Sequence, residues 1–119
     1  MTGKLTTHVL DISIGKPAGG VLVELVAVCQ NKGLEIIRSS YTNEDGRLNL
    51  ALLEGEDMKK GIYELHFHVA DYYRKIGASN ESPSFLDCVP VRFGVSDPAS
   101  HYHVPLLISP GGYSTYRGS

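Results

Sequence analysis

Short runs of β-branched and apolar residues, interrupted about every ten residues by turn formers, constrain this chain more than any other feature. The runs lie at 5–14, 21–30, 34–42, 47–53, 62–69, 88–95, 101–109 and 112–118. Between them stand stretches such as NEDG at 43–46, where Asp-Gly tolerates the positive φ of a tight connection. Seven to eight short strands at this spacing predict an all-β fold, a two-sheet β-sandwich.

One segment favours a helix over a strand. Asp71 can cap a short helix at 71–76, and Gly77 can end it. Pro90 stands near the start of the 88–95 run, which predicts an edge strand because proline cannot donate to a sheet on both sides. With 119 residues, the chain is expected to form a single domain at 1–119.

Several of the predicted strands are apolar on both faces. Successive side chains of a strand point to opposite faces, so a strand with one face in water should alternate apolar and polar residues. The run 5–14 instead has Leu5 and Val9 on one face and Leu10 and Ile12 on the other. We therefore expect another subunit to cover an outer sheet face, and hence an oligomer.

Composition excludes several classes of protein. The net charge of −2 gives no basic surface for nucleic acid, and no run of about 18 apolar residues predicts a membrane helix. The first residues lack the apolar core of a secretory signal, so the expected compartment is the cytoplasm, or the peroxisome or periplasm if a leader has been removed. Cys29 and Cys88 can form a disulfide, but two free thiols are the expected state in a cytoplasmic chain.

Histidines are the first candidates for chemistry. His66 and His68 form one H-x-H, and His101 and His103 form another. Residues two apart on a strand share a face, about 6.6 Å apart, which suits two ligands of one metal. For His66 and His68 we favour the alternative that they lie on the solvent face of a strand, because a lone H-x-H is a weak metal signal.

His8, His103, Arg47 and Arg117 each have two interpretations. His8 shares a face with apolar neighbours, where an imidazole is more often structural than catalytic, and the same holds for His103. Arg47 and Arg117 are either solvated cations or guanidiniums that bind a planar or anionic ligand. Spacing alone does not connect these residues to one site.

Four stretches carry a family resemblance: LTTHVLD, GKPAGGVLVEL, TNEDGRL and the closing HYHVPLLISPGGYSTYRGS. They resemble the 5-hydroxyisourate hydrolases, the enzymatic, transthyretin-like members of the transthyretin fold, from Leu5 to Ser119. The closing YRGS is highly specific to these enzymes. Gly111 and the segment SFLDCVPVRF depart from the family pattern without touching the site motifs.

The resemblance implies a transthyretin-like, Greek-key-type sandwich with one short helix. It implies a homotetramer, a dimer of dimers, with sites between subunits. The implied reaction belongs to urate degradation: water opens the six-membered ring of 5-hydroxyisourate to give 2-oxo-4-hydroxy-4-carboxy-5-ureidoimidazoline. The family uses neither a metal nor an organic cofactor.

The motifs also imply which residues act. His8, Arg47, His103 and Ser119 match catalytic positions of the family, and Tyr116 and Arg117 match substrate-binding positions together with His8 and Arg47. We expect a histidine to activate water, with His8 assisted by His103, although the sequence leaves their order open. Ser119 is expected to orient a histidine or the water. Three rival functions remain: a transthyretin-like carrier of small aromatic ligands, a metalloenzyme using the H-x-H pair, and a purely structural sandwich.

Overall fold

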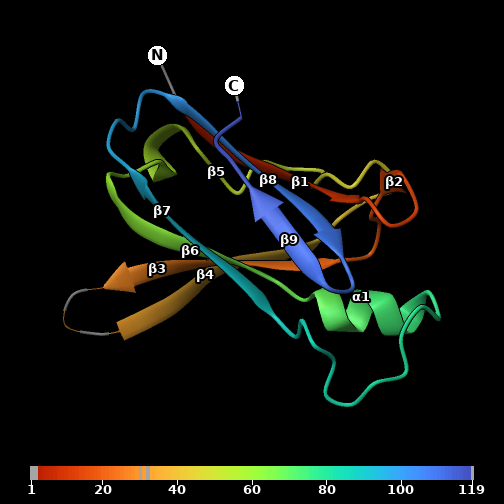
Figure 1. The fold of residues 1–119 in the computed structure, drawn as a ribbon. Coiled ribbons are helices and arrows are strands. Elements are labelled where there is room, and N and C mark those ends of the chain that lie inside the picture. Colours follow the sequence, from red (N-terminus) through yellow and green to blue (C-terminus); the bar gives the residue numbers. More distant parts are fainter. Residues whose placement is uncertain (1–2, 30, 32, 119) are drawn as a thin grey trace.

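Two β-sheets packed face to face make up the computed structural model, which describes residues 3–29, 31 and 33–118 (Figure 1). Sheet A has the order β2-β1-β8-β9, with β5 also paired to β1. Its strands are β1 (Lys4–Asp11), β2 (Lys16–Pro17), β5 (Leu53–Glu54), β8 (His101–Ser109) and β9 (Gly112–Thr115). Sheet B has the order β4-β3-β6-β7, formed by β3 (Leu22–Cys29), β4 (Gly33–Tyr41), β6 (Gly61–Phe67) and β7 (Val89–Val95). The predicted two-sheet β-sandwich is confirmed.

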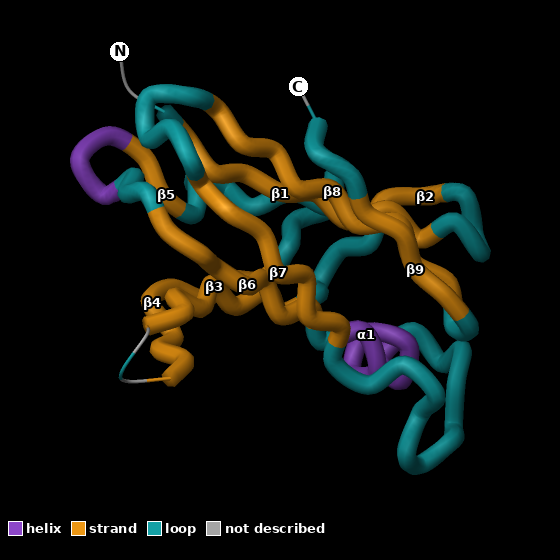
Figure 2. Tube along the Cα trace, turned by 60° about the vertical axis from the view of Figure 1, so that its left-hand side comes forward, coloured by secondary structure: helices purple, strands orange, loops and turns teal. Residues whose placement is uncertain are grey.

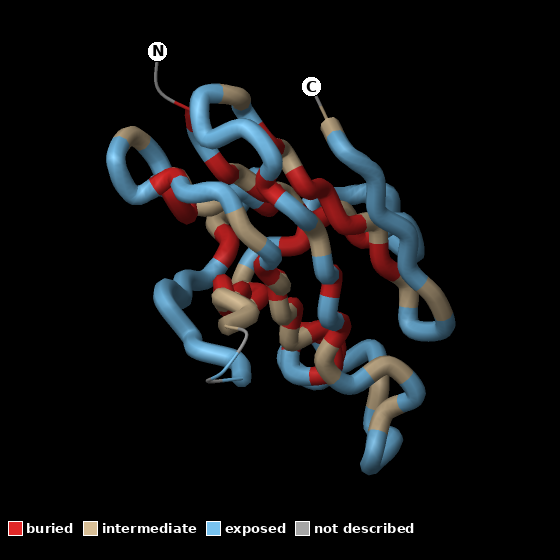
Figure 3. Tube along the Cα trace, turned by 90° about the vertical axis from the view of Figure 1, so that its left-hand side faces the viewer, coloured by how far each residue is buried: buried red, intermediate tan, exposed pale blue. Residues whose placement is uncertain are grey.

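The hydrophobic core lies between the two sheets, where Figure 3 shows the buried positions concentrated. Alternate residues of each strand point inward because of the period-two geometry of β-structure. The inward residues of sheet A and sheet B that are fully buried include Leu5, Val9, Leu106, Leu65 and Phe67. The opposite residues of the same strands therefore form the outer faces.

The predicted strand at 47–53 is wrong for most of its length. Arg47 forms one antiparallel bridge with His8, and only Leu53–Glu54 pairs as a strand, with the start of β1. Between these points Leu50 is 77% exposed, whereas the amide of Leu52 donates to the carbonyl of Leu5 at 2.8 Å. The alternating leucines resembled a strand, but the backbone of the segment pairs with β1 only near its two ends.

Helix α1 runs over Val69–Lys75, two residues earlier than predicted, and His68 rather than Asp71 precedes it. Burial explains the early start, because Val69 and Ala70 both pack into the interior. Gly77, with φ +75°, follows the end of the helix as predicted. Figure 2 shows α1 at the end of the sandwich near the turn between β8 and β9.

A buried carboxylate ties α1 to sheet A. Asp11, the last residue of β1, accepts hydrogen bonds from the hydroxyls of Tyr72 (2.9 Å) and Tyr73 (3.0 Å) and from the amide of Ser13 (3.0 Å). The strand predicted at 5–14 ends here, because the chain turns after Asp11 to donate the amide of Ser13 back to this carboxylate. Both carboxylate oxygens of the fully buried Asp11 therefore accept hydrogen bonds, as a buried polar group requires.

Other predictions about the strands are also settled by the structure. β7, which contains Pro90, is an edge strand of sheet B, as predicted. The strand predicted at 112–118 is regular only to Thr115.

Cys29 and Cys88 are unbonded, in agreement with the expected free thiols. No helix in the described ranges is long and apolar enough to span a membrane.

Candidate active site

The candidate site lies on the outer face of sheet A, where β1 and β8 run parallel. Thr6 is the register partner of His103, and His8 is the partner of Pro105. Because Leu5, Thr7 and Val9 point into the core, Thr6 and His8 point outward. This pairing brings together two strands that are nearly a whole chain length apart in sequence.

His8 and His103 are in direct contact. Nδ1 of His8 lies 2.6 Å from Nε2 of His103, and the ring centroids are 4.8 Å apart with 26° between the planes. The other nitrogen of His103, Nδ1, lies 2.8 Å from Oγ1 of Thr6. The two imidazoles and the hydroxyl therefore form one hydrogen-bonded chain along the face of the sheet.

A tight turn places Arg47 beside this chain. Gly46 has φ +73°, and its carbonyl accepts from the amide of Val9 at 2.8 Å. A Cβ on Gly46 would overlap the carbonyl oxygen of Val9, so only glycine allows the turn to lie this close to β1. The next residue, Arg47, is then held in its bridge to His8.

These side chains line one cavity of about 380 Å³, whose lining residues are Thr6, His8, Arg47, His101, His103, Tyr116 and Gly118. Its volume lies within the range of small-molecule sites. Most of the lining groups are polar, in contrast to the apolar core on the other side of the same sheet. The predicted residues His8, Arg47, His103 and Tyr116 are thus brought together from four separate segments.

The environment favours neutral imidazoles. Burial lowers the pKa of His8 from its ordinary 6.5, and the neighbouring His103 and Arg47 lower it further. Burial, followed by the charge of Arg47, also lowers the pKa of His103. Both rings are therefore neutral at neutral pH, so one of them must donate and the other accept in the bond that they share.

The C-terminal segment closes one side of the cavity. The amide of Gly118 donates to the carbonyl of His103 at 2.7 Å, which forms a single antiparallel bridge. A Cβ on Gly118 would lie 2.8 Å from Cδ2 of His103, so the backbone packs directly on the ring. Ser119, predicted to be catalytic, lies outside the described residues.

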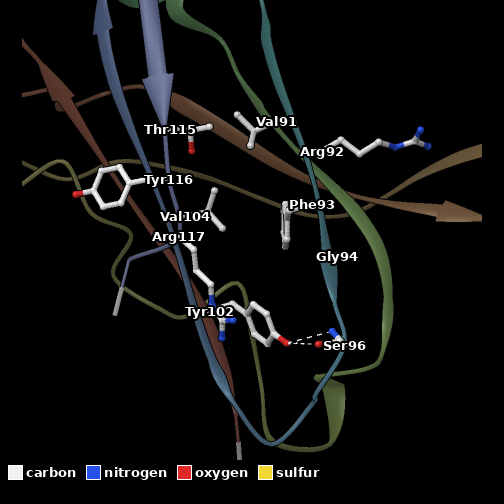
Figure 4. Close-up of a pocket in the computed structure, with 10 residues that line it drawn as sticks. All are labelled: Val91, Arg92, Phe93, Gly94, Ser96, Tyr102, Val104, Thr115, Tyr116 and Arg117. Atoms are coloured by element: carbon white, nitrogen blue, oxygen red, sulfur yellow. Dashed lines mark hydrogen bonds between the residues drawn. The ribbon is translucent and has the colours of Figure 1, made fainter.

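Arg117 is not brought to this cavity within the chain. Its guanidinium stacks on the ring of Tyr102, 4.1 Å from the centroid, and donates to the carbonyl of His101 at 3.1 Å. Figure 4 shows Arg117 pointing toward Tyr102, while the Tyr116 ring points away from Phe93. Arg117 therefore lines a second cavity of about 320 Å³, between the edge strands β7 and β9.

His66 and His68 pair with carboxylates on sheet B. Nε2 of His66 lies 2.8 Å from Glu64, and Nε2 of His68 lies 2.6 Å from Glu24. Tyr63, Leu65 and Phe67 point into the core, so His66 lies on the outer face as predicted, although its side chain is half-buried. His68 is also half-buried and lies after the end of β6, so the predicted strand at 62–69 is two residues too long. Within the described ranges, no three His, Cys, Asp or Glu side chains are grouped as metal ligands.

Three residues that line the site were not predicted as site residues: Thr6, Gly118 and His101, which the sequence offered only as half of an H-x-H pair. Thr6 resembles an ordinary strand residue, although its position two before His8 places it on the same face. Gly118 gives no signal on its own, because its need for a bare backbone arises only where it meets His103. The contact of Thr6 depends on a partner about a hundred residues away, and the contact of Gly118 depends on how the end of the chain packs.

Comparisons with known proteins find relatives over the full length of this chain. The model of the HIUase/Transthyretin family matches residues 5–118. A 5-hydroxyisourate hydrolase of Halalkalibacterium halodurans is 54% identical over 119 residues, which is 100% of both chains. Among solved structures, the 5-hydroxyisourate hydrolase of Klebsiella pneumoniae superposes with a TM-score of 0.81 at 34% identity, covering 98% of this chain and 99% of that one.

A solved (S)-allantoin synthase superposes with a TM-score of 0.92 at 40% identity. The match covers 99% of this chain but only 44% of the synthase chain, so the similarity concerns one part of that larger protein. The family match spans nearly every described residue, and a full-length relative exceeds half identity. The chain belongs to the HIUase/Transthyretin family.

Proposed function

We propose that this protein hydrolyses 5-hydroxyisourate, opening its six-membered ring to 2-oxo-4-hydroxy-4-carboxy-5-ureidoimidazoline as a step of urate degradation. The observation that carries the proposal is the 2.6 Å contact between His8 and His103 in the cavity that Arg47 also lines. It is supported by the full-length, 54% identical relative that bears this enzyme name.

Ring opening requires an activated water, a polarised carbonyl and a fixed substrate. His8 takes the proton from water as the water attacks the carbonyl carbon, and it later returns the proton to the ring nitrogen that leaves. His103 holds His8 in position through their shared bond. Acid–base catalysis by a positioned imidazole typically contributes about 10²–10⁴-fold to the rate.

Arg47 and Tyr116 bind the substrate in this mechanism. The guanidinium of Arg47 presents several fixed donors to the oxygen-rich ring and stabilises the oxyanion that forms during attack. Tyr116, which lines the same cavity, donates a hydrogen bond from its hydroxyl. These roles use water and side chains alone, so the proposed reaction needs no cofactor.

Arg117 and Ser119 are retained as proposed contributors from the family motif. Arg117 lines the cavity between β7 and β9, so in this proposal it contacts the substrate from that second cavity. Ser119 follows Gly118, which touches His103, so a role in orienting a histidine is compatible with its place in the chain.

The proposed assembly is a homotetramer, a dimer of dimers, with each site at a subunit interface. Apolar side chains remain exposed on and beside the outer face of sheet A: Ile12 is 58% exposed, Ile14 52% and Tyr113 46%. Covering them with a second copy would remove this apolar surface from water and would close the open cavity.

The proposed compartment is the cytoplasm. Cys29 and Cys88 are both unbonded, as is usual for proteins in a reducing compartment.

The test generates 5-hydroxyisourate from urate with a urate oxidase and follows the loss of its absorbance with and without this protein. We expect His8→Ala, Arg47→Ala and His103→Ala each to lower turnover at least about a hundredfold, since His8 and Arg47 act on the reacting atoms and His103 holds His8 in position. His66→Ala is the matched control, because His66 bonds Glu64 on the other sheet.

Wild-type protein that leaves the decay of 5-hydroxyisourate unchanged would refute the proposed function. Near-normal turnover in the Arg47 variant would refute only the role given to that residue. Size-exclusion chromatography of each variant at equal concentration separates a loss of chemistry from a loss of assembly.

A further inference from the structure

Both ring nitrogens of His103 are occupied, and this limits which imidazole can accept a proton from water. Nε2 lies 2.6 Å from His8 and Nδ1 lies 2.8 Å from Oγ1 of Thr6. On the ring edge, the backbone of Gly118 leaves no room for a side chain. His103 is therefore held on three sides, and among the described residues no bond is made to Nε2 of His8.

The hydrogen bonds of this chain can run in only two directions. A neutral imidazole has one N–H and one lone pair, whereas a threonine hydroxyl can either donate or accept. If Thr6 donates to His103, Nε2 of His103 donates to His8, and the free Nε2 of His8 carries a hydrogen. If Thr6 accepts, His103 accepts from His8, and Nε2 of His8 keeps its lone pair.

We propose that the hydroxyl of Thr6 accepts the Nδ1–H of His103 and thereby fixes His8 as the base, with its lone pair on Nε2 facing the cavity. Thr6 is a positioning residue in this scheme, because it acts on the substrate only through the two histidines. The inference rests on the proposed hydrolysis and extends it to the direction of proton transfer, which the sequence left open.

Only this direction serves the whole reaction. When Nε2 of His8 takes the proton from water, His8 becomes an imidazolium with hydrogens on both nitrogens, so its Nδ1–H must still donate to His103. Nε2 of His103 then still accepts, and its Nδ1–H still donates to Thr6. No other hydrogen has to move while the proton is taken up and returned.

The environment agrees with this arrangement. Burial and the charge of Arg47 lower the pKa of both histidines, so the resting pair is neutral and has a defined donor and acceptor. A carboxylate in the place of Thr6 would instead attract a second proton to the pair. A hydroxyl orients the rings without adding charge.

The first measurement needs no substrate. Imidazole ¹⁵N spectra of the wild-type protein, recorded at about pH 8 where the histidines are neutral, report which nitrogen of each ring carries the hydrogen. We expect the Nδ1–H tautomer for both His8 and His103. A wild-type spectrum with the Nε2–H tautomer at His8 overturns the inference, whatever the turnover.

The second measurement uses Thr6→Val, which keeps the side-chain shape but removes the hydroxyl, and Thr6→Ser, which keeps the hydroxyl. Thr6→Val should lower kcat at least about tenfold with KM within about threefold of wild type, and should lose the Nδ1–H tautomer of His103. Thr6→Ser should stay within about threefold of wild type in kcat. Unchanged kcat and unchanged tautomers in Thr6→Val would overturn the inference.

Thr7→Val is the control for a merely structural effect. Thr7 is the next residue of β1, but its hydroxyl donates to the carbonyl of Val104 at 2.6 Å inside the core. This variant should be less stable with the wild-type tautomers at both histidines. If wild-type protein does not hydrolyse 5-hydroxyisourate, the proposed function fails while the spectra still decide the tautomer.

Discussion

Replacing Gly46 with alanine should destabilise the protein and displace Arg47 from the site. Gly46 combines two demands that a single methyl group violates. Its φ is +73°, and an added Cβ would overlap the carbonyl oxygen of Val9. Gly15 offers a matched control, because its φ is +65° but nothing lies within 4 Å of an added Cβ.

The expected losses of stability differ, because Gly46 and Gly15 share only the cost of holding an alanine in a left-handed backbone conformation. A left-handed conformation costs an alanine about 1–2 kcal/mol, and the stiffer unfolded chain offsets about 0.4–1 kcal/mol of this. Gly15→Ala should therefore cost about 1 kcal/mol. At Gly46 the turn must also move away from β1, which breaks the 2.8 Å bond from the amide of Val9 and leaves a buried donor unpaired. That adds about 1–3 kcal/mol, for a total of about 2–4 kcal/mol.

Urea unfolding at equal protein concentration measures the two costs, since any assembly makes stability concentration-dependent. Turnover of 5-hydroxyisourate measures the displacement of Arg47. We expect Gly46→Ala to lose at least about tenfold in turnover, while Gly15→Ala stays near wild type. Equal stabilities of the two variants would refute the close approach to Val9. A destabilised Gly46→Ala with full turnover would refute the claim that the turn positions Arg47.

Three further predictions concern the pH dependence of turnover, the pH dependence of stability and the buried carboxylate. Because burial, His103 and Arg47 lower the pKa of His8, kcat/KM should be constant above about pH 7 and fall only as pH drops below 6.5. Arg47→Gln removes a positive charge and should move the fall in kcat/KM to higher pH. A pH–rate profile in which the fall stays at the same pH or moves to lower pH would contradict the assignment. The same lowered pKa values mean that the unfolded chain binds protons more readily, so stability should decrease as pH falls through 6.5. Asp11→Ala should lower the free energy of unfolding in urea by at least about 3 kcal/mol, because it leaves the buried hydroxyls of Tyr72 and Tyr73 without an acceptor. A loss below about 1 kcal/mol would show that these donors find other partners.

The sequence predicts elements well where burial follows a regular period. β6 alternates strictly, so the inward Leu65 and Phe67 and the outward His66 could be placed without coordinates. The prediction was wrong at 47–53 because a period-two run of leucines does not require a pairing partner along its whole length. It was wrong at the start of α1 because Val69 and Ala70 join the helix through tertiary burial rather than through a capping signal.

The site shows a different limit. Motif resemblance identified His8, Arg47 and His103, but spacing could not connect them, because their contacts depend on the parallel pairing of β1 with β8 and on a turn against β1. Arg117 shows the converse case, since a residue of a specific motif packs on Tyr102 instead of facing the histidines. A motif gives residue identity, whereas the direction of each side chain comes from the register.

Register also explains why the core and the site cannot vary independently. Val9 faces the core beside Leu106, and Thr6 faces the cavity beside His103, in one continuous parallel pairing. Because side chains alternate, a slip of one residue between β1 and β8 would turn a buried residue to solvent and would also separate the two histidines from the hydroxyl. The apolar residues that stabilise the sandwich therefore fix the distance between the imidazoles. A core substitution that left the fold intact but shifted this pairing would abolish turnover without touching any residue of the cavity.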